Sequence, residues 1–322
     1  MPNTVEKLLL ASPRGYCAGV DRAVQTVERA LEKHGAPVYV RKEIVHNKHV
    51  VEELRARGAV FVEEHTEVPE GAVCVFSAHG IAPSVREGAE QRGLVTIDAT
   101  CPLVTKVHRE AARFAEQGYT VVLVGHDGHE EVEGTMGEAP DQIVLVQDEA
   151  DVDALEVEDP ERVAFTTQTT LAVDETAAII ERLRERFPKI VSPRTDDICY
   201  ATTNRQSAVK QMARSCDLML VIGSRNSSNS VRLVEVARDC GTEAHLIDNA
   251  SEVREEWLEG RRVVGISSGA SAPENLVSEL VDLFRARGVS EDQISEFHVV
   301  SEDVRFMLPK PIRDPVAAGG TS

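Results

Sequence analysis

Short apolar runs bounded by turn residues alternate with amphipathic stretches along the whole chain. The runs typical of buried strands are KLLLAS, PVYVRK, AVCVFSA, TVVLVG, QIVLVQ, VAFTTQ, LMLVIG, AHLID and VVGISS. The stretches with the apolar spacing of helices are 21–34, 47–58, 104–117, 174–187, 204–214 and 274–287. Strands that alternate with helices in this way predict an α/β fold with mostly parallel sheets.

Three cysteines mark a repeat within this alternation. Each stands just ahead of a helical stretch, and the three segments are PRGYCAGVDRAV with Cys17, DATCPLVTKVHRE with Cys101 and DDICYATTNRQSAV with Cys199. The intervals between these cysteines are close to the length of one small α/β unit. We therefore expect three related α/β modules around a common centre. The expected boundaries are 7–98, 99–195 and 196–300, followed by a C-terminal extension, 301–322, with a frayed tail.

Polar loops follow the strands at matching places in each module. They are EIVHNKHV and FSAHGIAPS in the first, VGHDGHEEVEGTMGE and FTTQTTLAVDE in the second, and IGSRNSSNSVRL and GISSGASAPEN in the third. The loops at the carboxyl ends of parallel strands are where α/β sheets build their sites. We expect these loops to face the common centre.

Composition excludes several classes of partner. The net charge of −19 argues against a nucleic-acid partner, because Lys and Arg clusters hold phosphate backbones, and against an anionic membrane surface. The sequence contains neither the pattern of a secretory signal nor a run of roughly 20 apolar residues that could span a bilayer. We expect a cytoplasmic protein, whose six cysteines are thiols, metal ligands or catalytic groups and not disulfides.

The cysteines divide into two groups. Cys74, Cys216 and Cys240 lie in or beside apolar stretches and are expected to be small buried hydrophobes. The three marker cysteines lie at helix starts, where thiolates are favoured. They are either helix-start residues without a metal or three thiolates that converge on one. Iron–sulfur clusters usually take four cysteines, so three would leave one iron open, and zinc with three thiolates is the alternative metal.

Nine short motifs identify a family. In order they are PRGYCAGVDRA, EIVHN, SAHG, DATCP, GHDGHEEVEGTMGE, TQTT, DDICYATTNRQ, GSRNSSNS and GASAP. This set resembles the 4-hydroxy-3-methylbut-2-enyl diphosphate reductase family over roughly residues 7–312. The resemblance implies a cloverleaf of three α/β modules around one [4Fe–4S] cluster per chain with one open iron, which oxidation can convert to [3Fe–4S].

The resemblance also implies an activity. The family carries out the reductive dehydroxylation of (E)-4-hydroxy-3-methylbut-2-enyl diphosphate to isopentenyl diphosphate and dimethylallyl diphosphate, in the non-mevalonate isoprenoid pathway. The reaction takes two electrons and two protons, and the implied electron donor is a ferredoxin or flavodoxin. The implied substrate is therefore an allylic diphosphate.

Roles for single residues follow from the resemblance. Cys17, Cys101 and Cys199 match the cluster ligands. Glu131 matches the proton source, and only the resemblance selects it from the acidic run EEVE, while Thr169 would orient the substrate hydroxyl and relay a proton. The implied substrate-binding residues are His46, His79, His129, Thr169, Ser227, Ser228, Asn229 and Ser271, with Thr170 and Thr202 lining the same cavity.

Other residues and readings stay open at this point. Asn47 is expected only to fix the His46 loop, and Arg14, Arg205 and Arg232 are expected to be structural or surface charges. One alternative activity is an aconitase-like hydro-lyase, which performs no net reduction. Another is a phosphate-ligand-binding or redox-sensing α/β module without turnover.

Overall fold

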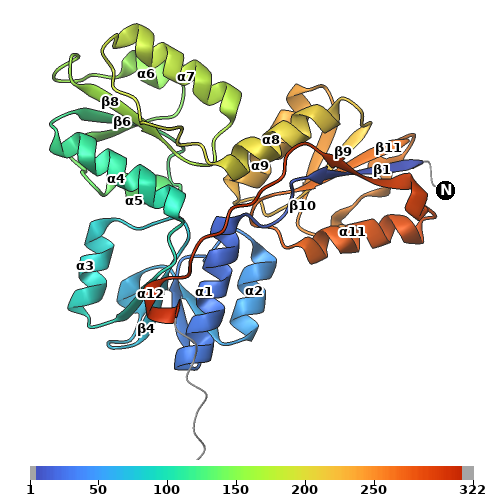
Figure 1. The fold of residues 1–322 in the computed structure, drawn as a ribbon, viewed down its shortest axis with the longest axis horizontal. Coiled ribbons are helices and arrows are strands. Elements are labelled where there is room, and N and C mark those ends of the chain that lie inside the picture. The colour runs from blue at the N-terminus through green and yellow to red at the C-terminus, as the bar shows by residue number, and fades with distance from the viewer. Residues whose placement is uncertain (1–4, 314–322) are drawn as a thin grey trace, which may run out of the picture.

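The computed structural model describes residues 5–313, which form three lobes around a common centre (Figure 1). Each lobe contains one parallel β-sheet with helices packed beside it. This arrangement confirms the expected α/β fold with three modules in a cloverleaf. No helix within residues 5–313 has the length and apolar character needed to cross a membrane.

The first lobe holds a four-stranded sheet in the order β3-β2-β4-β5. Its strands are β2 (Val38–Arg41), β3 (Ala59–Val62), β4 (Val73–Phe76) and β5 (Val95–Asp98), and its helices are α1 (Ala18–His34), α2 (Lys48–Ala56) and α3 (Pro83–Gln91), with a 3₁₀ turn at His65–Glu67. Val27 of α1 packs with Val40 and Ile97 of the sheet in a common core. The apolar stripe of α1 therefore fixes its position on the sheet, and with it the position of the loop that precedes the helix.

The second lobe holds a three-stranded sheet in the order β7-β6-β8. Its strands are β6 (Thr120–Val124), β7 (Ile143–Val146) and β8 (Val163–Thr167), and its helices are α4 (Pro102–Glu116), α5 (Glu130–Met136), α6 (Glu149–Ala154) and α7 (Val173–Arg186). All five residues of β8 are buried, as expected for a parallel strand that is covered on both faces.

The third lobe holds a five-stranded sheet in the order β10-β9-β11-β1-β12. Its strands are β1 (Lys7–Ser12), β9 (Leu218–Ile222), β10 (Glu243–Ile247), β11 (Val263–Ser268) and β12 (Ile294–His298), and its helices are α8 (Tyr200–Ala213), α9 (Ser228–Asp239), α10 (Glu255–Leu258) and α11 (Glu274–Ala286), with 3₁₀ turns at Ala250–Glu252 and Glu291–Gln293. Every pairing in this sheet is parallel.

Strand β1 lies in the third lobe although the expected boundary, 7–98, placed it in the first. It pairs with β11 on one side and β12 on the other, and in Figure 1 it is the blue strand within the otherwise yellow-to-red lobe. The apolar run KLLLAS needs neighbours on both edges and cover on both faces, and the centre of the largest sheet supplies them. The first sheet accordingly begins at β2.

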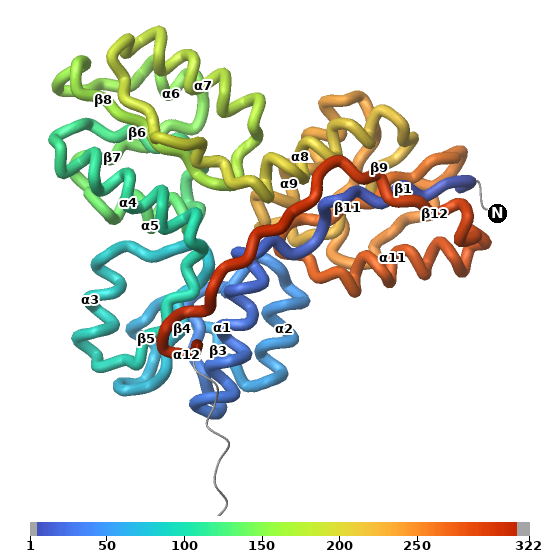
Figure 2. Tube along the Cα trace, in the orientation of Figure 1, coloured from blue at the N-terminus to red at the C-terminus, as the bar shows by residue number. Residues whose placement is uncertain are grey.

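The chain returns to the first lobe after β12. The segment 299–309, which we call the return segment, runs from the third lobe to the first and leads into α12 (Lys310–Arg313) (Figure 2). Leu308 and Ile312 pack into the core of the first lobe. The expected C-terminal extension is thus a tie between two lobes as far as residue 313, and its expected frayed tail lies outside the described residues.

The three cysteines expected to be buried hydrophobes differ in burial. Cys74 is fully buried in β4, whereas Cys216 and Cys240 are half-buried. Cys240 follows the last turn of α9, where the helix end faces solvent, and Cys216 lies in the turn before β9. Both nevertheless pack against the core of the third lobe, so the expectation holds for them only in part, because turns at the ends of elements lie closer to the surface than strand interiors.

Candidate active site

The three marker cysteines occupy the same structural position in three helices. Cys17, Cys101 and Cys199 are the N-cap residues of α1, α4 and α8, one helix from each lobe. All three line one cavity of about 100 Å³ at the centre of the molecule. The threefold recurrence in the sequence thus corresponds to convergence in space.

Gly19 shows how closely the sulfur atoms approach. A methyl carbon on its Cα would lie 2.7 Å from the Cys101 Sγ and 3.7 Å from the Cys17 Sγ. The two sulfur atoms therefore cannot be farther apart than the sum of these distances. A side chain at position 19 would occupy the space beside both thiols, which is the physical reason for a glycine inside this helix.

The electrostatics of the thiols favour a bound cation. Burial raises the pKa of the Cys101 thiol to about 12, and the neighbouring Cys17 adds to the shift. Burial likewise raises the pKa of Cys199 to about 11, with Cys17 adding again and hydrogen bonds from Thr202 opposing. Thiolates so close together would repel one another, so a thiophilic metal centre is the group that this set of donors fits.

A buried carboxyl group lies beside the cysteines. Glu131 is only 2% exposed, and its two oxygens accept hydrogen bonds from the Thr169 N–H at 2.7 Å and the Thr169 hydroxyl at 2.9 Å. Burial raises the pKa of Glu131 to about 7, although the Thr169 hydrogen bonds oppose the shift. The Thr169 carbonyl in turn accepts the Cys199 N–H at 3.0 Å, which ties the acid to the third cysteine. The site therefore holds a carboxyl group that is partly protonated near neutral pH.

The other two carboxylates of EEVE have different partners. Glu130 lies 3.1 Å from His79 Nδ1. Burial alone would raise the pKa of Glu130. The hydrogen bond and charge of His79, together with the charges of His46 and Lys42, lower it to about 2. Glu133 faces outward and pairs with Lys42 at 2.7 Å. Of the three, only Glu131 lines the cavity, so the geometry separates residues that the sequence alone does not.

Three histidines form one wall of the cavity. The rings of His46 and His79 are stacked with centroids 3.9 Å apart, and His129 meets them edge-on at 5.5 and 6.0 Å. Burial lowers the pKa of His129 to about 3 and that of His46 below its ordinary value, and the charges of neighbouring histidines add to both shifts. In the free protein His46 and His129 are therefore short of the positive charge that an anion would favour.

The same wall contains a possible cation cluster. Ligand atoms of His46, His79 and Glu130 lie within 4.8 Å of one another. The two imidazole planes are nearly parallel, 12° apart, so their in-plane nitrogen lone pairs do not converge on one point. The arrangement suits a multi-oxygen anion across both rings better than one metal ion.

Serine and asparagine side chains complete the cavity from the third lobe. Ser227 caps α9 by accepting the Ser230 N–H, and this helix start favours anions. The Asn229 amide donates to the Thr202 hydroxyl at 3.2 Å, and its oxygen accepts the Ala270 N–H at 3.0 Å.

Two further serines join the lobes at this wall. The Ser271 hydroxyl donates to the His46 carbonyl at 2.9 Å, which links the third lobe to the first. The Ser228 hydroxyl donates to the Thr170 carbonyl at 3.0 Å, which links the third lobe to the second. The cavity wall is therefore assembled from all three lobes.

The structure brings every site residue expected from the sequence to this cavity. They are Cys17, His46, His79, Cys101, His129, Glu131, Thr169, Thr170, Cys199, Thr202, Ser227, Ser228, Asn229 and Ser271. Asn47 caps α2 by accepting the Val50 N–H, as expected. The contribution of Glu130 to the histidine wall was not anticipated, because nothing in EEVE reports which side chain faces His79.

Three arginines considered in the sequence are paired with carboxylates. Arg14 pairs with Glu274 and Glu296, Arg205 with Glu302, and Arg232 with Glu175 and Glu235. None of the three lines the central cavity as the described residues form it. They are structural charges, as expected.

Known proteins resemble this chain over most of its length. The model of the LytB protein family matches residues 8–285. A 4-hydroxy-3-methylbut-2-enyl diphosphate reductase of Nocardia farcinica is 60% identical over 312 residues, covering 97% of this chain and 92% of that protein. The protein of the same name in Rhodococcus opacus is 60% identical over 309 residues, covering 96% and 91%.

Solved structures of reductases also resemble this chain. The E-1-hydroxy-2-methyl-but-2-enyl-4-diphosphate reductase of Plasmodium falciparum superposes with a TM-score of 0.91 at 37% identity, covering 97% of both chains. A structure of (E)-4-hydroxy-3-methyl-but-2-enyl diphosphate reductase, described as the terminal enzyme of the non-mevalonate pathway, gives a TM-score of 0.63 at 33% identity, covering 87% of this chain and 99% of that one.

Proposed function

The chain belongs to the LytB family of 4-hydroxy-3-methylbut-2-enyl diphosphate reductases, and we propose that its central cavity is the site of that reaction. The enzyme reduces (E)-4-hydroxy-3-methylbut-2-enyl diphosphate to isopentenyl diphosphate and dimethylallyl diphosphate. The hydroxyl leaves as water, and the reaction consumes two electrons and two protons. The observation that carries the proposal is the convergence of three helix N-cap cysteines, one per lobe, beside a buried acid.

Members of the family are iron–sulfur reductases, and we assign to this chain one [4Fe–4S] cluster held by Cys17, Cys101 and Cys199. The donor set supports this assignment, because three buried thiols converge on one cavity, and Gly19 leaves room between two of them. When bound, such a cluster supplies the electrons and one iron without a protein ligand, which acts as a Lewis acid. Oxidation can remove one iron from the cluster and leave a [3Fe–4S] form.

Glu131 supplies a proton in this proposal. Its raised pKa keeps a fraction of the carboxyl groups protonated near neutral pH, as a general acid requires. Thr169 donates to both carboxyl oxygens and lines the same cavity, so its hydroxyl can pass a proton onward. The same hydroxyl can orient the hydroxyl group of the substrate.

The diphosphate binds at the histidine wall and the serine loops. His46, His79 and His129 offer ring N–H donors, and Ser227, Ser228, Asn229 and Ser271 offer hydroxyl and amide groups. The start of α9 adds backbone N–H groups and the favourable end of its dipole. This cradle needs no lysine or arginine, because the diphosphate itself favours protonation of the histidines.

The remaining partners stay predictions. We propose a small ferredoxin or flavodoxin as electron donor. The expectations of no nucleic-acid partner, no membrane partner and a cytoplasmic location rest on the sequence alone.

The test is iron, acid-labile sulfide and turnover on protein purified without oxygen. We expect close to four irons and four sulfides per chain, and both products when a reduced viologen dye supplies electrons. Conversion without any reductant would favour the hydro-lyase. Zinc, or no metal, would remove the electron source and leave a binding module without turnover.

A further inference from the structure

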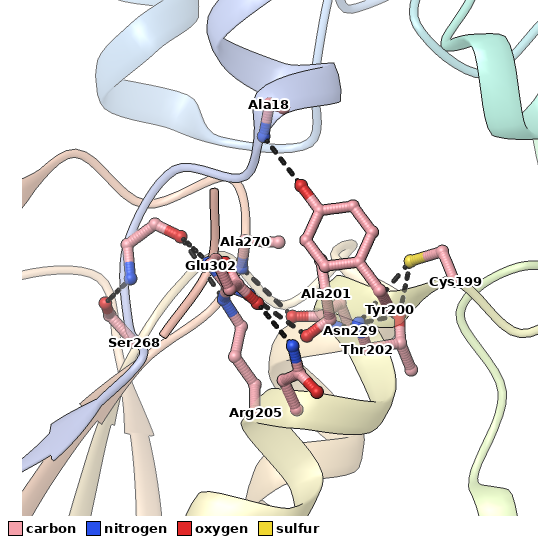
Figure 3. A network of polar contacts seen from close by, with 12 residues as sticks. Ala18, Cys199, Tyr200, Ala201, Thr202, Arg205, Asn229, Ser268, Ala270 and Glu302 are labelled. Carbon is pink, nitrogen blue, oxygen red and sulfur yellow. Dashed lines mark hydrogen bonds and ion pairs between the residues drawn. The ribbon is translucent and has the colours of Figure 1, made fainter. Parts of the chain in front are cut away.

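Arg205 is a fully buried cation six residues after Cys199, on α8. Its guanidinium group donates to three different segments of the chain (Figure 3). Nη2 donates to the Gly15 carbonyl at 2.8 Å, and Nη1 donates to the Ala201 carbonyl at 3.1 Å and to Glu302 Oε1 at 3.0 Å. One side chain therefore joins the loop before Cys17, the helix after Cys199 and the return segment.

Glu302 is the only carboxylate paired with Arg205 among the described residues. Its side chain is 14% exposed and also accepts a hydrogen bond from the Asn204 amide at 3.0 Å. Removing the carboxylate would leave a buried cation without its counter-charge, which is strongly unfavourable. The guanidinium would then have to move toward water or another acceptor, and its bond to Gly15 would move with it.

The loop that carries Cys17 takes its other hydrogen bonds from the third lobe as well. The Gly15 N–H donates to the Ser268 hydroxyl at 2.8 Å, and the Cys17 N–H donates to the Ala270 carbonyl at 3.2 Å. The Ala18 N–H donates to the Tyr200 hydroxyl at 3.2 Å (Figure 3). Cys17 therefore caps a helix of the first lobe but is held in place by the third. Tyr200 and Arg205, both on α8, hold the backbone on the two sides of this cysteine.

We propose that the Arg205–Glu302 pair is a positioning device that sets the distance between Cys17 and Cys199. The inference rests on the proposed function, in which these two cysteines hold the same cluster. Metal–ligand distances tolerate deviations of only about 0.2 Å, so two ligands from different lobes need a rigid link. Arg205 supplies this rigid link, and Glu302 holds the Arg205 guanidinium in position. The return segment therefore helps to bind the cluster, although Glu302 lies outside the cavity.

The test compares Glu302→Gln with Asp303→Asn. Both variants remove one negative charge from adjacent positions, but Asp303 is exposed and makes no hydrogen bond or ion pair within residues 5–313. Asn204→Ala is a milder third variant that keeps the ion pair and removes only the second partner of Glu302. Each protein is examined as the full chain, with and without its cluster.

Two readouts separate the steps of the inference. Hydrogen–deuterium exchange in the cluster-free protein reports the amides of Gly15, Cys17 and Ala18, which donate to the third lobe. We expect the exchange of these amides to be at least about tenfold faster in Glu302→Gln. In Asp303→Asn we expect both the exchange and the melting temperature to stay at wild-type values. Loss of the visible absorption of the cluster to a chelator should then be about 10–100-fold faster in Glu302→Gln, the usual effect of removing a group that orients a ligand. Asn204→Ala should shift both readouts in the same direction by less.

The outcomes are distinct. Faster exchange without faster cluster loss, or unchanged exchange, would refute the positioning role, and so would equal effects in Asp303→Asn. If Glu302→Gln did not fold, Asn204→Ala would decide by the same criteria. A wild-type protein that takes up no cluster after anaerobic reconstitution would instead refute the proposed function, and that result is seen before any variant is made.

Discussion

Gly19→Ala should separate folding from cluster binding. The added methyl carbon would lie 2.7 Å from the Cys101 Sγ, whereas non-bonded heavy atoms settle at roughly 3.5 Å or more. The sulfur would therefore have to move by roughly 0.8 Å, about four times the deviation that metal–ligand distances tolerate. Without a cluster the Cys101 side chain can rotate away, so the same overlap is far less costly in the empty protein.

The effect on the fold itself should be small. Overpacking usually costs about 1–3 kcal/mol, and alanine stabilises a helix over glycine by up to about 1 kcal/mol. The free energy of unfolding of the cluster-free protein should thus change by about 2 kcal/mol or less. Circular dichroism should show wild-type helix content in this variant.

The assay is iron and sulfide content after anaerobic reconstitution, with Gln25→Ala as the control at an exposed position of the same helix. We expect Gly19→Ala to retain less than about a tenth of the wild-type iron. Wild-type iron content with wild-type resistance to a chelator would refute the reasoning, because it would mean that the Cys101 sulfur does not bind the cluster where the structure places it.

Three further predictions concern titrating groups. Glu131→Gln should keep its cluster and lose about 10²–10⁴-fold in turnover, and full turnover in a cluster-replete variant would exclude Glu131 as the proton source. Because the pKa of Glu131 rises from 4.5 to about 7 on folding, the cluster-free protein should lose stability relative to Glu131→Gln as the pH rises from about 4.5 to about 7, by up to about 3 kcal/mol. Denaturant titrations at the two ends of that range measure the free energy of unfolding of both proteins. A difference between the two proteins that does not change with pH would contradict the raised pKa. Inorganic diphosphate should bind more tightly at about pH 6 than at about pH 8, because it favours the protonated forms of His46 and His129, whose pKa values are low in the free protein. Calorimetry in two buffers of different ionisation enthalpy should show proton uptake, and proton release would contradict the assignment of the histidine wall.

The sequence predicts the type of most elements but not their partners. KLLLAS is a strand, as its apolar run indicates, yet the run cannot report that its neighbours lie more than 250 residues away in β11 and β12. The helix expected at 204–214 begins earlier, at Tyr200. Its first turn, YATT, carries no apolar spacing from which this start could be predicted. The edge strand β12 was missed, since ISEFH mixes polar and apolar residues on a partly exposed edge.

The candidate site was predictable to the level of loops and not of single side chains. The cysteine repeat and the polar loops indicate one centre, because parallel strands end on the same edge of a sheet. The run EEVE cannot separate its members, because neighbouring helix residues point about 100° apart and only the packed lobes decide which direction is the cavity. The Arg205–Glu302 pair was unpredictable for a similar reason, since nothing local relates α8 to the return segment.

The central place of β1 in the last sheet has a consequence for how the protein is made. KLLLAS leaves the ribosome more than 250 residues before the strand that pairs with it through Lys7 and Val263. Until β11 has been made, this apolar segment has no sheet to pair with, while the first two lobes can already fold from contiguous sequence. The loop of Cys17 takes its hydrogen bonds from the same late lobe, so the three cysteines can come together only after that lobe has been made. Nascent chains that stall before β11 should therefore be held by chaperones or aggregate, and they cannot mature as partial enzymes.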